Sequence, residues 1–264
     1  MSNYIVTSLW IYPVKSLGGI RVPSAKVMMK GLQYDRRWML IDSTDTFMTQ
    51  REFPRMALFK MTKEDDKIIV NYEGNEIDIT ANTSGPKINA TVWNDRVDVY
   101  EVSEEHSKWF SRNLGVSCRL VHLPEDSHRP VEINGSFDEG SMSLADAYPL
   151  LIIGQSTLDD LNSRLIEAVP MNRFRPNIVF EGAAAYEEDS WKMLSVGVNR
   201  FSGVKQCARC PITTVNQDTA EKGKEPLATL AGYRKSGNKV LFGQNLVPLD
   251  YSMIAEGDEI ISAG

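Results

Sequence analysis

The segment KQCARCPITT, residues 205–214, holds two of the three cysteines on either side of an arginine. Thiolates at Cys207 and Cys210 could ligate a metal, form a redox pair or carry sulfur, or the two thiols could be buried without chemistry. Arg209 argues against an inert core, because a guanidinium is almost never buried unless it pairs with a carboxylate or a bound anion.

Zinc and dithiol redox chemistry are the less favoured readings of this motif. A structural zinc site needs four ligands, and one C-x-x-C supplies two. No further pair at ligand spacing lies near the motif among Cys118, His106, His122 and His128. A thioredoxin-like pair should open a helix that lowers the thiol pKa. Here Pro211 and the β-branched run ITTVN predict a strand instead.

Several cationic side chains occur at turn-like positions elsewhere. Lys15 and Ser16 precede two glycines, Arg36 lies at the entry of a strand, and Arg175 and Asn177 flank a proline. Taken singly, each charge is expected on the solvated surface. Together they could form a phosphate pocket, although spacing alone does not show that they converge. A thiolate beside such a pocket would suit a soft transition metal carried by a phosphorylated organic cofactor.

The composition is that of a soluble globular protein. The 264 residues are 42% hydrophobic and 24% charged, a length at the boundary between one domain and two. The net charge of -6 argues against a broad nucleic-acid-binding face. No apolar run approaches a membrane span, and the first residues do not read as a secretory signal. We expect a cytoplasmic protein with no nucleic-acid or membrane partner.

The elements that must position these residues are mostly short strands. Residues 1–102 contain a succession of β-like runs separated by turn signals, which suggests a barrel or sandwich domain. These runs are YIVTSLWIY, RVPSAKVMM, RRWMLID, TFMTQ, MALFKMT, KIIVNY, EIDITA and RVDVYEV. Residues 103–264 form the second predicted domain.

The second domain combines strands with a few helices. One helix is predicted between Ser103 as N-cap and Gly115 as stop. A strand CRLVHL and a long polar loop over 124–141 follow, and a second helix is expected to start at Ser156 with Asp159 helping to cap it. Further strands are expected at NIVFEG, KMLSVGV, ITTVN, KVLFG and EIISAG, with a short helix at EPLATLAGY.

Eight motifs in order resemble one family. They are YPVKSL, YDRRWML, MTQREFPRM, FRPNIV, EDSWKML, CARCPITTVNQDT, EPLATLAGYR and FGQNL. The chain is similar over nearly its whole length to proteins with a MOSC N-terminal β-barrel domain followed by a MOSC domain, of the bacterial YcbX type and the mitochondrial amidoxime-reducing component. The resemblance implies a mainly β fold, with a β-barrel-like first domain, a MOSC β-barrel second domain and a few peripheral helices.

The resemblance also implies a molybdenum cofactor, a molybdopterin, and reduction of N-hydroxylated compounds such as amidoximes and N-hydroxylated bases. Cys210 matches the metal ligand, and Cys207 is then a packing residue or a minor neighbour of the site. The cofactor-binding positions match Lys15, Ser16, Arg36, Arg175, Asn177 and Arg209. Asp146 matches a position lining the pocket and is the candidate proton donor, or else pairs with a neighbouring cation. Ala208 stands where relatives often carry serine, so one hydroxyl contact is expected to be missing.

Electrons are expected from a separate ferredoxin or flavin reductase type of protein. Some YcbX-type chains continue into a ferredoxin domain, but Cys118 is the only cysteine here outside the motif and cannot hold such a cluster by itself. Two rival functions stay open: a sulfur carrier with a persulfide on Cys210, and a binding module that has lost the metal.

Overall fold

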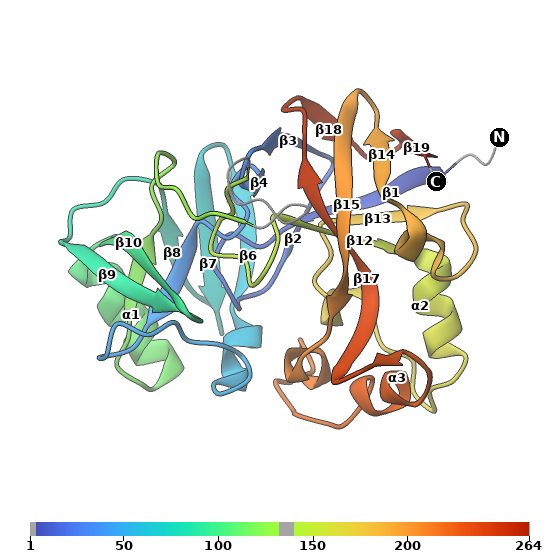
Figure 1. Ribbon diagram of the computed structural model, residues 1–264. Helices are drawn as coiled ribbons and strands as arrows, with labels where there is room; N and C mark the ends of the chain where they lie inside the picture. Colours follow the sequence, from blue (N-terminus) through green and yellow to red (C-terminus); the bar gives the residue numbers. More distant parts are fainter. Residues whose placement is uncertain (1–3, 132–139, 264) are drawn as a thin grey trace.

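A closed barrel forms the larger part of the computed structural model, which describes residues 4–131 and 140–263 (Figure 1). Seven strands follow one another around it and the first pairs with the last. In barrel order they are β12 (Leu150–Gly154), β13 (Ile178–Glu181), β1 (Tyr4–Ile11), β19 (Glu259–Ala263), β14 (Met193–Val196), β15 (Asn199–Ala208) and β17 (Lys239–Pro248). Two short strands, β2 (Ile20–Val22) on β1 and β16 (Lys235–Ser236) on β17, extend the same sheet.

Three smaller sheets account for the other described strands. The four-stranded sheet has the order β5 (Trp38–Ile41), β11 (Arg119–His122), β10 (Asp95–Glu101) and β9 (Lys87–Val92). The two three-stranded sheets are β18 (Met253–Ala255), β3 (Ser24–Met28), β4 (Gly31–Leu32), and β6 (Lys60–Glu64), β7 (Lys67–Tyr72), β8 (Asn75–Ile79). The expected mainly β fold with barrel sheets and few helices is confirmed.

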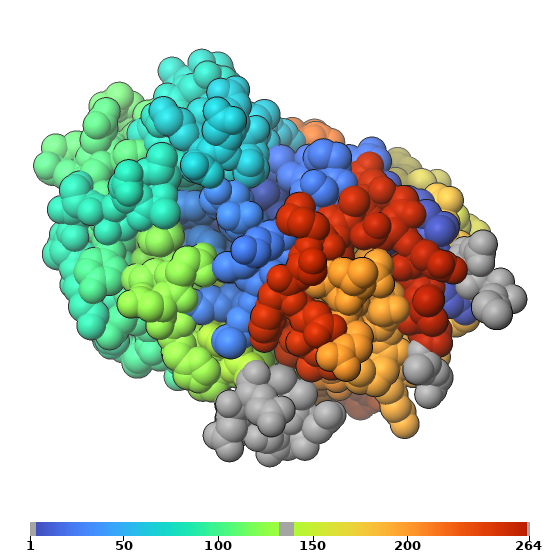
Figure 2. All heavy atoms as spheres, turned by 90° about the horizontal axis from the view of Figure 1, so that it is seen from above, coloured from blue at the N-terminus to red at the C-terminus, as the bar shows by residue number. Residues whose placement is uncertain are grey.

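Strand pairing joins the two halves of the chain. β1 lies between β13 and β19 although it opens the sequence, and β11 pairs with β5 and β10 although it follows the first helix. Figure 2 shows the early, blue residues lying between the green and the red parts of the surface. The division into 1–102 and 103–264 stays a prediction, and these pairings cross it in both directions.

The three described α-helices lie at the edges of the sheets. α1 (Glu104–Leu114) has Ser103 accepting from the backbone N–H of His106 and ends at left-handed Gly115, as the sequence predicts. α2 (Gln155–Asn162) starts directly after β12 at Gly154, and Asp159 accepts from the side chain of Gln155 instead of capping the helix. α3 (Leu227–Tyr233) is the expected short helix. None of the described helices has the length and apolar character of a membrane span.

Two runs that the sequence predicts as strands form none, and the first residues of a third, MALFKMT, lie in a 3-10 turn over Pro54–Leu58. The run ITTVN is not a strand: Pro211–Thr214 forms a 3-10 turn with Cys210 as its N-cap, because proline is pre-set for a first helical position. The run TFMTQ makes only isolated bridges, Ile41 with Phe47 and Thr46 with Thr91. Of the expected polar loop over 124–141, residues 132–139 lie outside the described residues.

Gly203 in β15 gives a test of how tightly the barrel is packed. A Cβ at this position would lie 1.9 Å from the carbonyl oxygen of Trp191, which is backbone and cannot rotate away. We expect Gly203→Ala to lower the free energy of unfolding in urea by about 3 kcal/mol, the upper part of the usual cost of overpacking. Gly232→Ala in α3, where the added Cβ meets open space, should instead leave stability unchanged or raise it by about 0.5–1 kcal/mol. Equal stability of the two variants would contradict this packing.

Candidate functional site

One cavity of about 250 Å³ brings together all the site residues that the sequence singles out. Its lining includes Lys15, Ser16, Arg36, Asp146, Arg175, Asn177, Cys207, Arg209 and Cys210. These residues come from loops at the ends of β1, β5, β12, β13 and β15, up to 195 positions apart in the chain, from 15 to 210. Convergence, which spacing could not show, is therefore a property of the fold.

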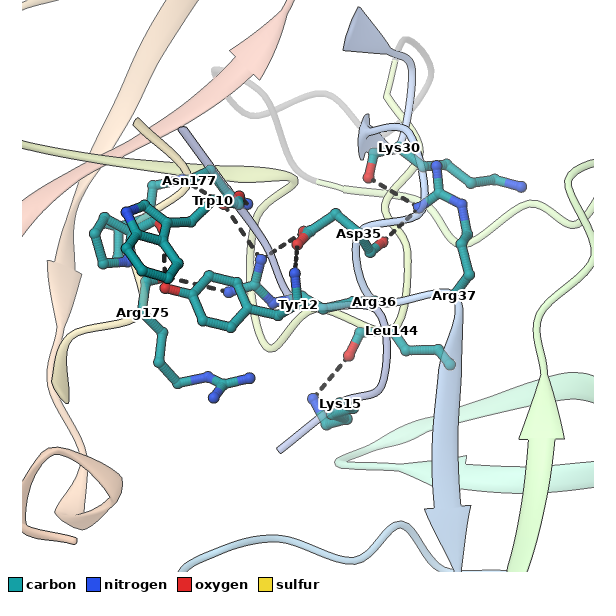
Figure 3. Close-up of polar contacts among 12 residues, drawn as sticks. Trp10, Tyr12, Lys15, Lys30, Asp35, Arg36, Arg37, Leu144, Arg175 and Asn177 are labelled. Carbon is teal, nitrogen blue, oxygen red and sulfur yellow. Dashed lines mark hydrogen bonds and ion pairs between the residues drawn. The ribbon is translucent and has the colours of Figure 1, made fainter. Parts of the chain in front are cut away.

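Tyr12 holds two guanidinium groups against its ring. The central carbon of Arg175 lies 4.2 Å from the ring centroid and that of Arg36 lies 4.7 Å from it (Figure 3). The Tyr12 hydroxyl donates to the carbonyl of Pro176 at 3.1 Å, and its backbone N–H donates to the Asp35 carboxylate at 2.8 Å. The ring is thus fixed at both ends, and it offers a π face to both cations.

Arg36 cross-links the loops around Tyr12. Its guanidinium pairs with the buried Asp35 carboxylate and donates to the amide oxygen of Asn177 at 3.2 Å and to the carbonyl of Arg175 at 3.3 Å. Burial acts to lower the pKa of Arg36, and the carboxylate of Asp35 more than offsets it, so the pKa is raised. Arg36 therefore stays charged at the cavity wall.

Asn177 joins three parts of the barrel through both ends of its amide. The side-chain oxygen also accepts from the backbone N–H of Leu151 at 3.2 Å, and the side-chain nitrogen donates to the carbonyl of Trp10 at 3.1 Å. Its backbone bonds to the same two residues. Asn177 is buried and its role in the structure is to lock β1 and β12 beside the cavity.

Arg175 is a buried cation with no carboxylate of its own among the described residues. Its side chain donates to the carbonyl of Leu17 at 2.6 Å, and the residue is 7% exposed. Burial lowers its pKa to about 10, and the like charge of Arg36 adds to the effect. The guanidinium is charged at neutral pH, so an anion in the cavity would relieve an unfavourable burial.

Lys15 also belongs to the lining, in an ion pair with Asp146. Its ammonium also donates to the carbonyl of Leu144 at 2.7 Å. Burial lowers the pKa of Lys15, and Asp146 partly opposes this. Partial burial acts to raise the pKa of Asp146, but the charge and hydrogen bond of Lys15 together with the indole N–H of Trp93 hold it well below the usual value.

Arg209 has one hydrogen-bond donor without a partner among the described residues. It donates to the carbonyl of Phe174 at 2.7 Å and to the sulfur of Cys207 at 3.0 Å, while its buried Nε has no hydrogen-bond partner among the described residues. An unsatisfied buried donor costs about 1–3 kcal/mol, so a ligand that accepts from it would recover that cost. The contact with Arg209 gives Cys207 a part in orienting the cation, beyond the packing that the sequence suggested.

Cys210 lies at the bend between β15 and the 3-10 turn, half-buried, with its thiol at the cavity. Among the described residues, no cluster of three His, Cys, Asp or Glu side chains could hold a metal ion. A metal at Cys210 would therefore have to bring most of its ligands with it.

Backbone strain is concentrated at this site. Ser16, Arg36 and Arg175 have φ values of 67°, 52° and 57°, in the left-handed region that residues other than glycine seldom adopt. Such strain gathers at ligand-binding positions, where the surrounding structure holds it in place.

Sequence reasoning missed several residues of the site. Tyr12 and Asp35 organise the cations from behind the lining. Lys205, Lys239 and Asn245 belong to the lining itself. Asp35 carried a usable signal, since it stands directly before Arg36 and a buried guanidinium needs a partner.

Comparisons with known proteins identify the family of the chain. The chain matches the MOSC N-terminal beta barrel domain over residues 3–117 and the MOSC domain over residues 139–261. It is 34% identical to mitochondrial amidoxime-reducing component 1 of Mus musculus, over 98% of this chain and 82% of that protein. The same protein of Homo sapiens is also 34% identical, over 98% of this chain and 83% of its own length. The molybdenum cofactor sulfurase of Oryza sativa subsp. japonica is 31% identical over the whole chain, which spans only 34% of that protein.

The cationic lining predicts that the cavity binds a simple anion. We expect Arg175→Ala to weaken binding of inorganic phosphate about 10- to 100-fold, since charge-assisted hydrogen bonds contribute about 1.5–3 kcal/mol. Isothermal titration calorimetry at constant ionic strength measures this. Arg21→Ala is the control, because Arg21 is a surface residue paired with Glu256 at 2.8 Å and lies outside the lining. Equal phosphate affinity in the two variants would contradict the anion site.

Proposed function

This chain belongs to the family of proteins with a MOSC N-terminal β-barrel domain and a MOSC domain that includes the mitochondrial amidoxime-reducing components, and on that basis we propose that it is a molybdenum-cofactor-dependent oxidoreductase. Its substrates would be N-hydroxylated compounds, amidoximes or N-hydroxylated bases, and the reaction would reduce their N–O bond. The observation that carries the proposal is the single cavity where a half-buried thiol meets buried cations.

The donor set of the cavity fits a phosphorylated pterin. Arg36, Arg175 and Arg209 offer guanidinium groups of the kind that bind phosphate in a planar, two-pronged way. The Nε of Arg209, a buried donor without a partner in residues 4–131 and 140–263, would be satisfied by such a group. Lys15, Ser16 and Asn177 complete the set that would hold the cofactor.

Cys210 is the residue that would ligate molybdenum, because a thiolate suits a soft metal and the rest of the coordination can come from the cofactor. When bound, the molybdenum would supply the two-electron change that N–O reduction requires. Cys207 would instead accept a hydrogen bond from Arg209 and so hold that side chain in place. The two thiols thus have different tasks.

The role of Asp146 would be to hold Lys15 in place through their ion pair, and it would not be the proton donor. Its pKa lies well below the usual value, so it is ionised at neutral pH and has no proton to give. The ammonium of Lys15 does carry a proton, and burial lowers its pKa. Of the two groups, Lys15 is therefore the better candidate for the proton that the release of water needs.

A sulfur carrier is the second candidate function. It is favoured by the similarity to the rice molybdenum cofactor sulfurase, of which the chain spans about a third. In this case Cys210 would hold a persulfide, and the neighbouring Arg209 would stabilise the sulfur anion. Molybdenum and pterin content of natively expressed protein separates the two functions.

Replacement of each thiol tests their separate roles. Cys210→Ser exchanges a soft ligand for a hard hydroxyl, so molybdenum content and N–O reduction should fall to background while the circular dichroism spectrum stays unchanged. Cys207→Ser keeps a small acceptor beside Arg209 and should retain most of both. Equal loss of activity in the two variants, with cofactor still bound, would favour a dithiol mechanism.

The source of electrons is the other test. These 264 residues hold one cysteine outside the C-x-x-C and no G-x-G-x-x-G segment, so they offer no evident route from NADH. We expect no reduction with NADH and an N-hydroxylated base alone. Addition of a ferredoxin or flavin reductase type of partner, or of a low-potential artificial reductant, should start the reaction in molybdenum-loaded protein. Loaded protein that stays inactive with several reductants but passes labelled sulfur from Cys210 to an acceptor would favour the sulfur carrier.

A further inference from the structure

An exposed tryptophan lies at the edge of the cavity in a conformation that favours glycine. Trp93 is 43% exposed and has a φ of 58°. It is the first of the two residues that join β9 to β10, because Val92 pairs with Asp95. Tight hairpin turns need a positive φ at this place and usually fill it with glycine or asparagine. The hairpin therefore keeps an indole where a bulky side chain is strained.

The indole is attached to the wall of the cavity. Its N–H donates to the carboxylate of Asp146 at 3.1 Å, and Asp146 in turn pairs with Lys15. Asp146 and Lys15 both belong to the lining of the cavity that contains Cys210. Trp93 itself is not part of the enclosed lining, so it lies at the rim.

Two more side chains pack against the indole, and the Phe47 ring is tilted by 53° from its plane. The guanidinium carbon of Arg51 lies 4.2 Å from the Trp93 ring centroid, and the Phe47 ring lies 5.1 Å from it. The ammonium of Lys15 is 5.2 Å from the centroid of Phe47, which connects this surface to the lining a second time. We call Phe47, Arg51 and Trp93 the rim platform.

The size of the cavity leaves the substrate at this rim. A site that encloses one drug-sized ligand usually has about 300–1,000 Å³. The cavity here has about 250 Å³, below this range, and a phosphorylated cofactor would take up much of it. The ring of a substrate would then lie at the mouth, where it meets side chains such as those of the rim platform.

We propose that the rim platform binds the planar aromatic ring of the substrate by stacking, with Trp93 as a specificity-determining residue. The site would then prefer N-hydroxylated compounds whose nitrogen is attached to an aromatic ring, such as hydroxylamino-purines, over aliphatic ones. An indole supported by a guanidinium offers a large, rigid surface to any aromatic base. The inference rests on the proposed function for the N–O chemistry, but ring binding can be measured without turnover.

The experiment compares a planar and an aliphatic ligand, neither of which can be reduced. Binding of adenine and of acetamidine to the natively expressed protein is measured by equilibrium dialysis. Trp93→Asn removes the ring and keeps a residue that tolerates the left-handed backbone, whereas Trp93→Phe keeps a flat ring without the N–H. Tyr251→Asn is the matched control, because Tyr251 is 47% exposed and lies outside the cavity lining.

Trp93→Asn should weaken adenine binding about tenfold and leave acetamidine binding unchanged, since loss of one stacked aromatic typically has an effect of this size. Trp93→Phe and Tyr251→Asn should bind adenine within about twofold of the parent. Undiminished adenine binding in Trp93→Asn, or no adenine binding by the parent, overturns the proposal. An equal loss for both ligands also overturns it, because Trp93 would then act only by orienting Asp146. Ring-selective binding in a protein that never reduces an N–O bond would support the platform and reject the proposed function instead.

Discussion

The site depends on how two buried guanidinium groups are kept together. Arg36 and Arg175 share the ring of Tyr12, and the charge of Arg36 opposes that of Arg175, which lowers the pKa of Arg175. Asp35 neutralises one of them, and the amide of Asn177 orients the same one. Arg175 is left with a carbonyl and a π face, which leaves part of its charge available to a ligand.

This arrangement explains why the strained backbone occurs where it does. Ser16, Arg36 and Arg175 each have left-handed backbone in a loop next to a strand, and all three line the same cavity. Each left-handed residue costs about 1 kcal/mol or more, and the hydrogen bonds that join the loops offset it. Rigid loops lose little further freedom when they bind a ligand, which favours affinity.

The sequence predicted the parts of the fold that local chemistry decides. α1 was recognisable from its caps at Ser103 and Gly115, and the short strands from their β-branched alternation. The strand predicted over residues 211–214 was wrong, because the proline after Cys210 outweighs the β-branched residues and starts a 3-10 turn. The pairing of β1 with β13 and β19 could not be predicted from the sequence, because barrel closure pairs segments that are distant along the chain.

The same limit separates what the sequence could say of the site from what it could not. From residue types alone, Lys15, Arg36, Arg175 and Arg209 were recognisable as cations that need partners, and the order of the motifs indicated a family. Neither observation showed how far apart these side chains lie in the fold. Only the fold shows that the sulfur of Cys207 accepts a hydrogen bond from Arg209, and that the Nε of Arg209 has no partner within the described part of the chain. Among the described residues other buried polar atoms also lack a partner, so the donor of Arg209 points to a bound group because it belongs to the side chain that lines the same cavity as the thiol of the motif.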